Sequence, residues 1–300
     1  MISWEAPIWI YLWLAGMAGG AYFAAFLAER FAGVTGGRLL QVATCLGIPL
    51  AGIGVLLLIV DLGYPIRFWH LLVRFLAVSP MSMGTWVLMV WVIVAAAMVA
   101  LWLGELYVPR LADLRLGPLN LRRMIEVLSW IDLVFAALLM SYTGVLLATS
   151  NQPLWAGSIL LPPLFVASAI STGVALLIVA AVTVRALEIP GRTVSQLAEA
   201  DAVVILIELA VLVGYSIWLA VSAMEGTGEA LRLLPTGVLA APFWAGVVLL
   251  ALLVPLGLEV ANWGKELEGK AVWRAVLASA VCVVFGGLVL RAVITIGGQM

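Results

Sequence analysis

The sequence predicts an all-α membrane protein, a polytopic bundle of eight transmembrane helices that forms one domain over residues 1–300. Apolar and aromatic residues make up 65% of the chain and charged residues only 10%, and the mean hydropathy is +1.20. Soluble domains contain about 45–50% apolar and about 25% charged residues. A soluble fold is therefore excluded, and a net charge of −1 gives no basic surface for nucleic acid.

Eight apolar stretches are long enough to cross a bilayer. A hydrocarbon core of about 30 Å requires roughly 20 helical residues. The first stretch lacks the basic segment of a signal peptide, so we expect it to be retained as a span. The predicted spans are residues 7–31, 39–60, 83–107, 122–149, 160–187, 201–224, 237–261 and 271–296.

The distribution of lysine and arginine predicts the orientation of the bundle. Connections after odd-numbered spans contain 11 basic residues: Arg30, Arg38, Arg110, Arg115, Arg122, Arg123, Arg185, Arg192, Lys265, Lys270 and Arg274. The opposite side contains four: Arg67, Arg74, Arg232 and Arg291. Cytoplasmic connections are the ones enriched in lysine and arginine. We therefore expect both termini on the outer side of the cytoplasmic (inner) membrane.

The first span is rich in small residues. Ala15, Gly16, Gly19 and Gly20 have the spacing that lets two membrane helices approach closely. This pattern favours a packing role. A groove that admits a flat ring against the glycine face is the alternative.

The outer connection between spans two and three predicts an interfacial amphipathic helix over residues 65–77. It begins with a proline, which is tolerated at the first helical position. Arg67, His70 and Arg74 recur on one face, and apolar residues cover much of the rest. Such helices often only seal a bundle at the headgroup level. However, these basic residues lie on the side poor in lysine and arginine, which favours a binding role.

Several blocks of residues along the chain carry a family resemblance. The first block comprises Asp61-Leu62-Gly63, Pro65, Arg67-Phe68-Trp69, Ser79-Pro80-Met81-Ser82 and Gly84-Thr85-Trp86. Later blocks comprise Tyr142-Thr143-Gly144-Val145-Leu146-Leu147, Leu161-Pro162-Pro163-Leu164-Phe165, Ser168-Ala169, Thr172-Gly173, Gly286-Gly287, Arg291 and Gly298-Gln299. Together they resemble the NrfD-like family, the membrane subunits of polysulfide reductase and related complexes. The chain departs from the family pattern at Tyr64, where many members have arginine.

The resemblance implies a membrane anchor that is noncatalytic alone and exchanges electrons with a quinone. We expect the quinone to be menaquinone. The implied partners are a four-cluster ferredoxin-like iron-sulfur subunit and a catalytic molybdopterin subunit, both on the extracytoplasmic side, and they would hold the clusters and molybdopterin. The residue count separately excludes a diheme cytochrome b, because four axial histidines are required and the chain has one, His70.

The resemblance also implies a quinone site near the outer face. Tyr142 matches the family tyrosine that hydrogen-bonds the quinone, and a phenol can donate to a carbonyl and move a proton. Without the resemblance, a tyrosine near a helix end is an aromatic anchor at the membrane surface. The predicted quinone-binding residues are Asp61, Arg67, Trp69, His70, Tyr142 and Thr143. Arg67 and Arg74 are also predicted to dock the partner.

Carboxylates within the spans predict proton transfer, since such groups are costly to keep in a membrane. Asp132 and Glu208 lie in the inner half, and Glu259 and Glu105 lie nearer the cytoplasmic edge. We hypothesise a relay through Glu208 and Asp132 toward the outer site. The alternative is a buried ion pair or a hydrogen bond between helices. Arg291 either pairs with Asp61 or faces the quinone headgroup.

Two other functions use similar features. A secondary transporter also has intramembrane carboxylates, but the two halves of this chain show no repeat. A purely structural anchor would not explain Asp132 or Glu208. The terminal substrate, the direction of electron flow and proton-gradient formation stay open at this level.

Overall fold

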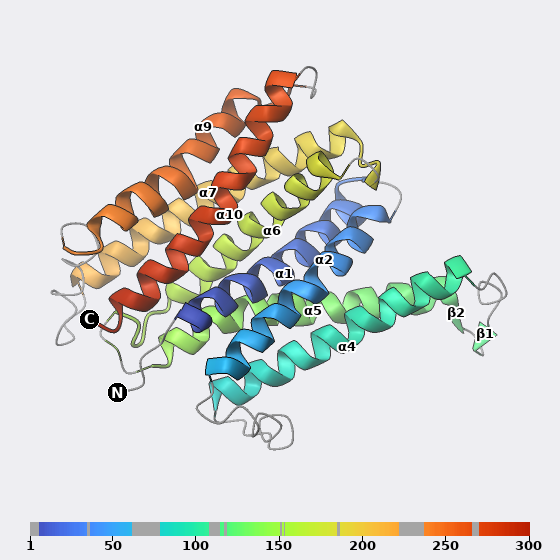
Figure 1. Cartoon of the computed structure of the whole chain (residues 1–300), viewed down its shortest axis with the longest axis horizontal. Helices are drawn as coiled ribbons and strands as arrows, with labels where there is room; N and C mark the ends of the chain where they lie inside the picture. Colours follow the sequence, from blue (N-terminus) through green and yellow to red (C-terminus); the bar gives the residue numbers. More distant parts are fainter. Residues whose placement is uncertain are drawn as a thin grey trace.

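The computed structural model describes residues 6–34, 37–61, 79–107, 115–116, 119–150, 152, 154–184, 187–221, 237–265 and 270–300. Within these residues, eight helices are long and apolar enough to cross a membrane, so the predicted eight-span helix bundle is confirmed. Both termini lie at the same end of the bundle (Figure 1). We call this the outer end and the opposite one the inner end, following the predicted orientation.

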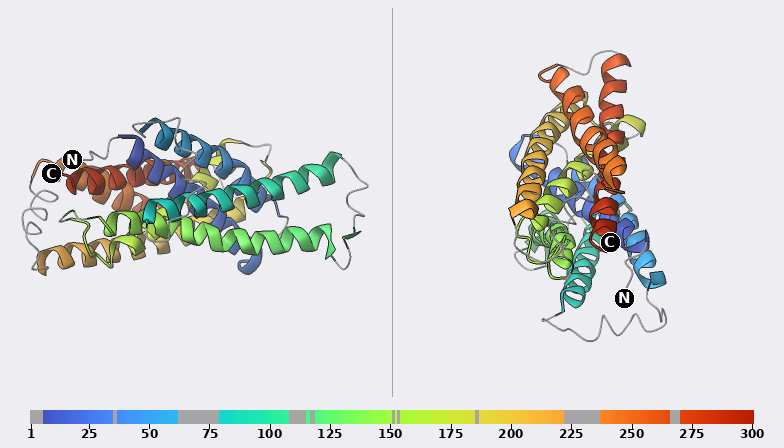
Figure 2. Two further views of the ribbon diagram at one scale, coloured as in Figure 1. Left: turned by 90° about the horizontal axis from the view of Figure 1, so that it is seen from below. Right: turned by 90° about the vertical axis from the view of Figure 1, so that its left-hand side faces the viewer.

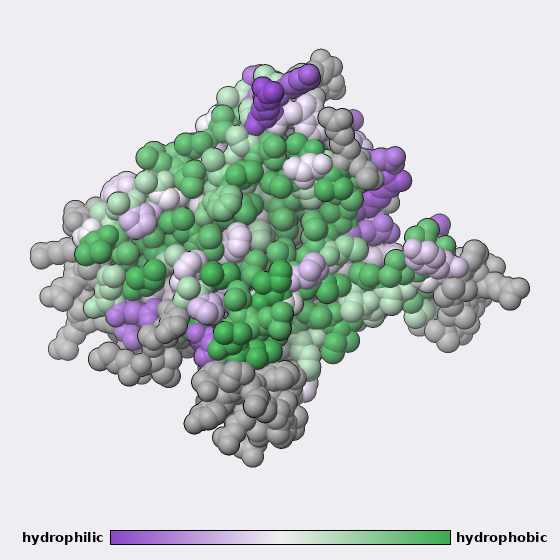
Figure 3. Space-filling view, in the orientation of Figure 1, coloured by the Kyte–Doolittle hydropathy of each residue, from purple (hydrophilic) through white to green (hydrophobic). Residues whose placement is uncertain are grey.

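The membrane helices follow one another along the chain. They are α1 (Ala6–Phe31), α2 (Arg38–Asp61), α4 (Pro80–Tyr107), α5 (Leu121–Ala148), α6 (Leu161–Thr183), α7 (Gly191–Val221), the π-helix η4 (Pro242–Leu253) continued by α9 (Val254–Ala261), and α10 (Lys270–Gly297). Two short antiparallel strands, β1 (Arg115–Leu116) and β2 (Leu119–Asn120), lie at the inner ends of α4 and α5 (Figure 2). Apolar residues cover most of the face seen in Figure 3, as expected for a surface in lipid.

Helix α1 is the central element of the bundle. It packs against α2, α5, α6 and α10. Its most apolar window is 78% buried, whereas that of α4 is only 22% buried, so α4 lies at the edge. The helix that holds the two halves of the bundle together is therefore the first one in the chain.

Glycines allow α1 and α6 to meet backbone to backbone. A Cβ atom on Gly20 would lie 1.8 Å from the carbonyl oxygen of Ala169, and one on Gly173 would lie 2.1 Å from the nitrogen of Ala21. Van der Waals packing of small residues is a main source of helix association in lipid. The packing role predicted for Gly20 is confirmed.

Helix α7 differs from the predicted span, because it begins at Gly191 and not at residue 201. Hydropathy marks where a helix is apolar, whereas this first part is helical and polar. Its side chains bind the connection between α9 and α10: Ser195 Oγ donates to the Lys265 carbonyl at 3.1 Å, and Glu199 Oε1 accepts from the Gly264 nitrogen at 3.0 Å. The extra turns place Asp201 inside the bundle. Helix α6 ends at Thr183, before the predicted residue 187.

The connection between α5 and α6 folds into the outer end of the bundle. Leu154 and Trp155 are fully buried. The Trp155 indole donates to the Ile294 carbonyl at 2.8 Å, and the Tyr215 hydroxyl donates to the Leu154 carbonyl at 2.5 Å. These bonds tie the connection to α10 and α7. The predicted interfacial helix over residues 65–77 lies outside the described residues.

We predict that Gly20→Ala destabilises the protein by roughly 1–3 kcal/mol, because the added methyl group must push α6 away from α1. The measurement is unfolding of the purified protein in detergent, followed by circular dichroism. Gly52→Ala is the control, because a Cβ at Gly52 of α2 meets nothing within 4 Å. Equal stability of the two variants would contradict the close contact between α1 and α6.

Candidate functional site

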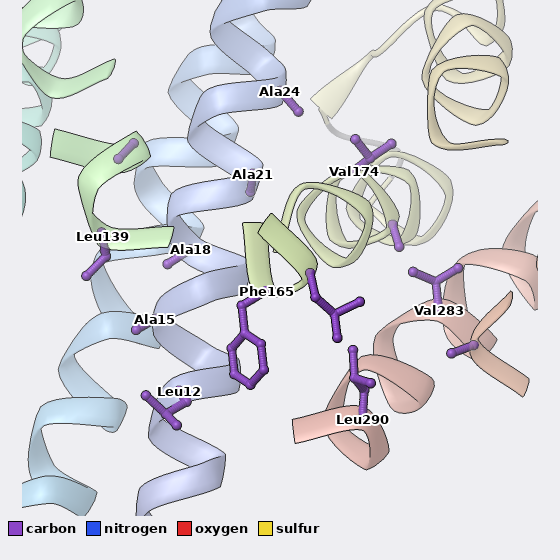
Figure 4. Close-up of a cluster of buried hydrophobic side chains, with 14 of the residues drawn as sticks. Leu12, Ala15, Ala18, Ala21, Ala24, Leu139, Phe165, Val174, Val283 and Leu290 are labelled. Carbon is purple, nitrogen blue, oxygen red and sulfur yellow. The ribbon is translucent and has the colours of Figure 1, made fainter. Parts of the chain in front are cut away.

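Three sets of buried or half-buried polar side chains are separated by apolar packing. Alanines along α1, Leu139 of α5 and Phe165 of α6 belong to this apolar core (Figure 4). We call the sets the phenol pair (Tyr11 and Tyr142), the first polar group (Tyr22, Glu29, Ser129 and Asp132) and the second polar group (Ser168, Ser171, Asp201, Glu208, Glu259, Ser279 and Arg291). The phenol pair and the first polar group both lie on α1 and α5 at different depths, whereas the second polar group lies on α6, α7, α9 and α10.

The phenol pair lies near the outer end. Tyr142 of α5 is 9% exposed, and its ring lies directly against α4, where a Cβ atom on Gly84 would be 1.9 Å from its Cζ. The Tyr11 phenol of α1 lies close enough to interact electrostatically with that of Tyr142. Gly54 of α2 in turn faces the Tyr11 ring, 3.0 Å from a Cβ to Cδ2. Helices α1, α2, α4 and α5 therefore meet around two phenols.

The other predicted quinone-binding residues divide into three cases. Asp61 ends α2 at the outer end and is half-buried. Thr143 is fully buried, but its hydroxyl donates to the Met140 carbonyl at 2.6 Å and is thus engaged within its own helix. The remainder lie outside the described residues: Arg67, Trp69, His70 and Arg74.

The first polar group lies between α1, α4 and α5, toward the inner end. Tyr22 is fully buried, and its hydroxyl donates to the Ser129 carbonyl at 3.1 Å. The same hydroxyl lies 3.6 Å from the Met98 sulfur and interacts electrostatically with Asp132 and Glu29. Asp132 is fully buried, and neither of its carboxyl oxygens has a hydrogen-bond partner among the described residues.

Arg291 is the outermost member of the second polar group and is fully buried. Its Nη1 donates to Ser168 Oγ at 3.2 Å and to the Gly287 carbonyl at 3.0 Å. The guanidinium carbon lies 5.4 Å from the centre of the Phe165 ring, within cation–π range. A Cβ on Gly16 of α1 would be 2.8 Å from Nη2, so a glycine is required there.

The guanidinium of Arg291 thus lies inside the bundle, next to the Glu208 carboxylate with which it interacts electrostatically. Ser168 interacts with both side chains. The sequence left two alternatives for Arg291, pairing with Asp61 or contact with the quinone headgroup. The observed contacts of Arg291 match neither. For Glu208 the expected alternative was a buried ion pair or a hydrogen bond between helices, and its interactions are with Ser168 of α6 and Arg291 of α10.

Two further carboxylates continue the second polar group toward the inner end. Glu259 of α9 accepts from Ser279 Oγ of α10 at 2.7 Å. Asp201 of α7 is fully buried and interacts electrostatically with Glu259 and Glu208, and neither of its carboxyl oxygens has a hydrogen-bond partner among the described residues. The second polar group therefore extends from Glu259 of α9, through Asp201 and Glu208 of α7, to Arg291 of α10.

Sequence reasoning missed Asp201, because the predicted span began at that residue and placed its carboxylate at the membrane surface. The signal that could have found it is Pro190 followed by helix-compatible residues from Gly191, which extends α7 and brings Asp201 inside.

The predicted relay through Asp132 and Glu208 is divided by the fold. Asp132 belongs to the first polar group on α5, whereas Glu208 belongs to the second on α7, and α6 packs against both of these helices. Glu105 is exposed at the inner end of α4, beside a groove of about 430 Å³ that Gln41 and Cys45 also line. Glu259 is buried with Asp201, so three of the four predicted carboxylates lie inside the bundle.

Charged residues at the inner ends of the helices form ion pairs. Arg30 pairs with Glu126 at 3.1 Å, joining α1 to α5, and Arg38 pairs with Glu188 at 2.5 Å. The hydrogen bond and charge of Arg38 lower the pKa of the Glu188 carboxyl. Within the part of the chain that the structure describes, no group of three or more His, Cys, Asp or Glu side chains could hold a metal ion.

Comparisons with known proteins agree over the full length of the chain. The family model described as polysulphide reductase, NrfD, matches residues 1–300. Protein NrfD of Escherichia coli K12 is 30% identical over 314 residues, which cover 100% of this chain and 96% of the relative. The polysulfide reductase C subunit of Wolinella succinogenes is 29% identical over 318 residues, covering 99% and 95%. An NrfD homolog of Haemophilus influenzae is 25% identical over 309 residues, covering 100% and 95%.

We predict that Arg291→Gln destabilises the protein by about 3 kcal/mol, because it leaves the buried Glu208 without its cationic neighbour. The double variant Arg291→Gln/Glu208→Gln should recover roughly 1–2 kcal/mol of that loss. Unfolding in mixed micelles measures both values. Arg274→Gln, at an exposed position of the same helix, is the control and should stay within about 0.5 kcal/mol of the parent. Additive effects of the two substitutions would rule out a direct interaction between the two side chains.

Proposed function

Because this chain belongs to the polysulphide reductase NrfD family, we propose that it is the quinone-binding membrane subunit of a respiratory oxidoreductase complex, noncatalytic by itself. Family membership confirms the resemblance found in the motifs and identifies the chain as a multi-pass membrane subunit. The observation that carries the quinone assignment is the phenol pair. Two phenols that interact electrostatically lie near the outer end, where four helices meet.

The phenol pair fits the chemistry of a quinone headgroup. A quinone presents two carbonyl acceptors on a flat ring, and a phenol hydroxyl is a matching donor. Neither Tyr11 nor Tyr142 donates a hydrogen bond to another described residue, so this part of the chain leaves both donors available to a ligand. The ring of Tyr142 is fixed against Gly84, which holds its hydroxyl in one place. When bound, a quinone supplies two-electron, two-proton redox chemistry.

We propose that Tyr142 donates a hydrogen bond to a quinone carbonyl and moves a proton at its phenol oxygen. Asp61 ends α2 at the same level and is proposed to complete the outer side of the site. The outer connection supplies Arg67, Trp69 and His70 in this proposal. Thr143 would act through packing, since its hydroxyl is engaged with Met140.

The proposed partners are the subunits that carry the metal centres. The name of the Wolinella relative, which designates one lettered subunit of polysulfide reductase, implies that other subunits accompany it. By analogy, an iron-sulfur subunit of the four-cluster ferredoxin type would dock at the outer end, with Arg67 and Arg74 among its contacts. Electrons would then pass between its nearest cluster and a menaquinone beside Tyr142. A molybdopterin subunit would carry the terminal reaction.

We further propose that the buried carboxylates transfer protons. A carboxylate in a membrane interior is costly and usually has a function. Asp201, Glu208 and Glu259 form one series of such groups, and Asp132 is separate. Glu105 is exposed and is at most a surface group for collecting protons. The competing transporter function is disfavoured by family membership, and no contact in the described part of the bundle favours it.

We predict that the termini lie outside the cytoplasm. Alkaline phosphatase fused after Met300 should be active in whole cells, because that enzyme folds only outside the cytoplasm, and a fusion after Leu187 should be inactive. Equal activity of the two fusions would reject this topology. The prediction follows from the 11 basic residues assigned to the opposite side.

We predict that Tyr142→Phe lowers quinol-linked turnover of the assembled complex by about 10²-fold, because the phenol proton is lost while the ring still packs against Gly84. Turnover is assayed with a soluble menaquinol analogue, and bound quinone is measured by extraction. Tyr215→Phe is the matched control, since that buried phenol only bonds to the Leu154 carbonyl. Unchanged turnover and quinone content in Tyr142→Phe would show that the phenol pair is not the quinone site.

A further inference from the structure

A groove lies at the inner end of the bundle, where α6 ends and α10 begins, and we call it the basic groove. Its volume is about 430 Å³. Lys270, Trp273 and Arg274 of α10 line it, together with Ala181 and Val182 of α6. Lys270 and Arg274 are four residues apart, so both lie on one face of α10. In Figure 3, hydrophilic residues gather at the end of the bundle where α10 begins in Figure 1.

The basic groove carries positive charge that the described residues do not neutralise. Lys270 and Arg274 are exposed, and neither forms an ion pair or a hydrogen bond with another described residue. Of the described residues that line the groove, only Glu188 is acidic, and its carboxylate pairs with Arg38 at 2.5 Å. The described part of the chain therefore leaves both cations available to an anion.

An exposed apolar stripe continues from Arg274 toward the middle of the membrane. Ala278, Val281 and Phe285 follow Arg274 at intervals of four, three and four residues, which places them on one face of α10. We call these three residues the apolar stripe, and each of them is exposed. The helix rises about 16 Å between Arg274 and Phe285. This length matches one leaflet, since half of a 30 Å hydrocarbon core is roughly 15 Å.

The charge and the stripe together match an anionic phospholipid. Such a lipid has a negative headgroup at the membrane surface and acyl chains that extend to the middle of the bilayer. Guanidinium and ammonium groups bind phosphate oxygens, and a tryptophan ring is suited to the headgroup level. Basic pockets between helices on the cytoplasmic side recognise anionic headgroups. The positive-inside rule explains basic residues at this end, but it requires neither a groove nor an apolar stripe beside them.

We propose that the basic groove and the apolar stripe form a binding site for one anionic phospholipid of the inner-end leaflet. Its phosphate binds Lys270 and Arg274, the Trp273 ring lies at the level of its glycerol, and one acyl chain lies along the apolar stripe. The site goes beyond the proposed function, because α6 and α10 belong to the half of the bundle that does not contain the phenol pair. A bound lipid would join the start of α10 to the end of α6.

The test is thermal unfolding of the purified full chain in neutral detergent, with one of three additives: phosphatidylglycerol, phosphatidylcholine or inorganic phosphate. Phosphatidylglycerol should raise the melting temperature of the parent by about 3 °C or more, because a ligand of the folded state stabilises it by mass action. Phosphatidylcholine has the same phosphate but no net charge, and inorganic phosphate has no acyl chain to cover the stripe. Neither of these should produce the shift.

Lys270→Gln/Arg274→Gln should lose the shift with phosphatidylglycerol and keep the melting temperature of the parent without lipid, since both residues are exposed. Arg122→Gln/Arg123→Gln is the matched control, because it removes two exposed cations from the inner end of α5 and should keep the full shift. If the first double variant does not fold, Arg274→Gln alone should lose about half of the shift.

A parent-sized shift in Lys270→Gln/Arg274→Gln, or equal shifts with phosphatidylglycerol and phosphatidylcholine in the parent, would overturn the lipid site. An equal shift with inorganic phosphate would replace the lipid by a soluble anion and would also reject the proposal. Quinone content is measured on the same samples and should be unchanged in Lys270→Gln/Arg274→Gln. Tyr142→Phe should keep the shift with phosphatidylglycerol, so failure of the lipid site and failure of the quinone site are distinguishable.

Discussion

The contact between α1 and α6 is the constraint on which the other features depend. At Gly20 and Gly173 the two backbones touch, and no side chain fits between them. Helix α1 therefore packs against both halves of the bundle. One face of α1 carries Tyr11 and Tyr22, and the other face packs Gly16 against Arg291. A wider spacing would move Arg291 away from Ser168 and open the apolar core of Figure 4.

The distribution of charge follows from the cost of placing ions in lipid. In the second half of the bundle, Arg291 balances Glu208, and hydroxyls of α6 and α10 lie beside the remaining carboxylates. Among the described residues of the first half, Asp132 forms no ion pair, and the Tyr22 phenol interacts with it electrostatically. The cost is thus offset in one half by a buried charge of opposite sign and by hydroxyl groups. In the other half, Asp132 has no hydrogen-bond partner among the described residues.

The sequence predicted the eight helices because membrane thickness acts on every span in the same way. It could not predict which helices would be neighbours, since that depends on long-range packing, and it therefore joined Asp132 and Glu208 in one relay. Asp201 was missed because hydropathy marks the apolar part of α7 and not its helical start. The π-helix η4 was also missed, because hydropathy does not distinguish a π-helix from an α-helix. Tyr142 and Gly84 both lie in family motifs, but only the structure shows that one packs on the other.

The two halves of the bundle also differ in structure at the outer end. The connection after α5 places Trp155 between α10 and the end of the chain, where a Cβ on Gly298 would lie 2.0 Å from its ring. This buried indole covers the outer side of the half that contains Arg291. The phenol pair lies in the other half, beside the ends of α2 and α4 and the outer connection between them. In the described part of the chain, Trp155 therefore covers part of the outer side of one half, whereas the phenol pair lies near the outer end of the other. The proposed electron exchange therefore involves the first half, on the side of α1 away from Arg291.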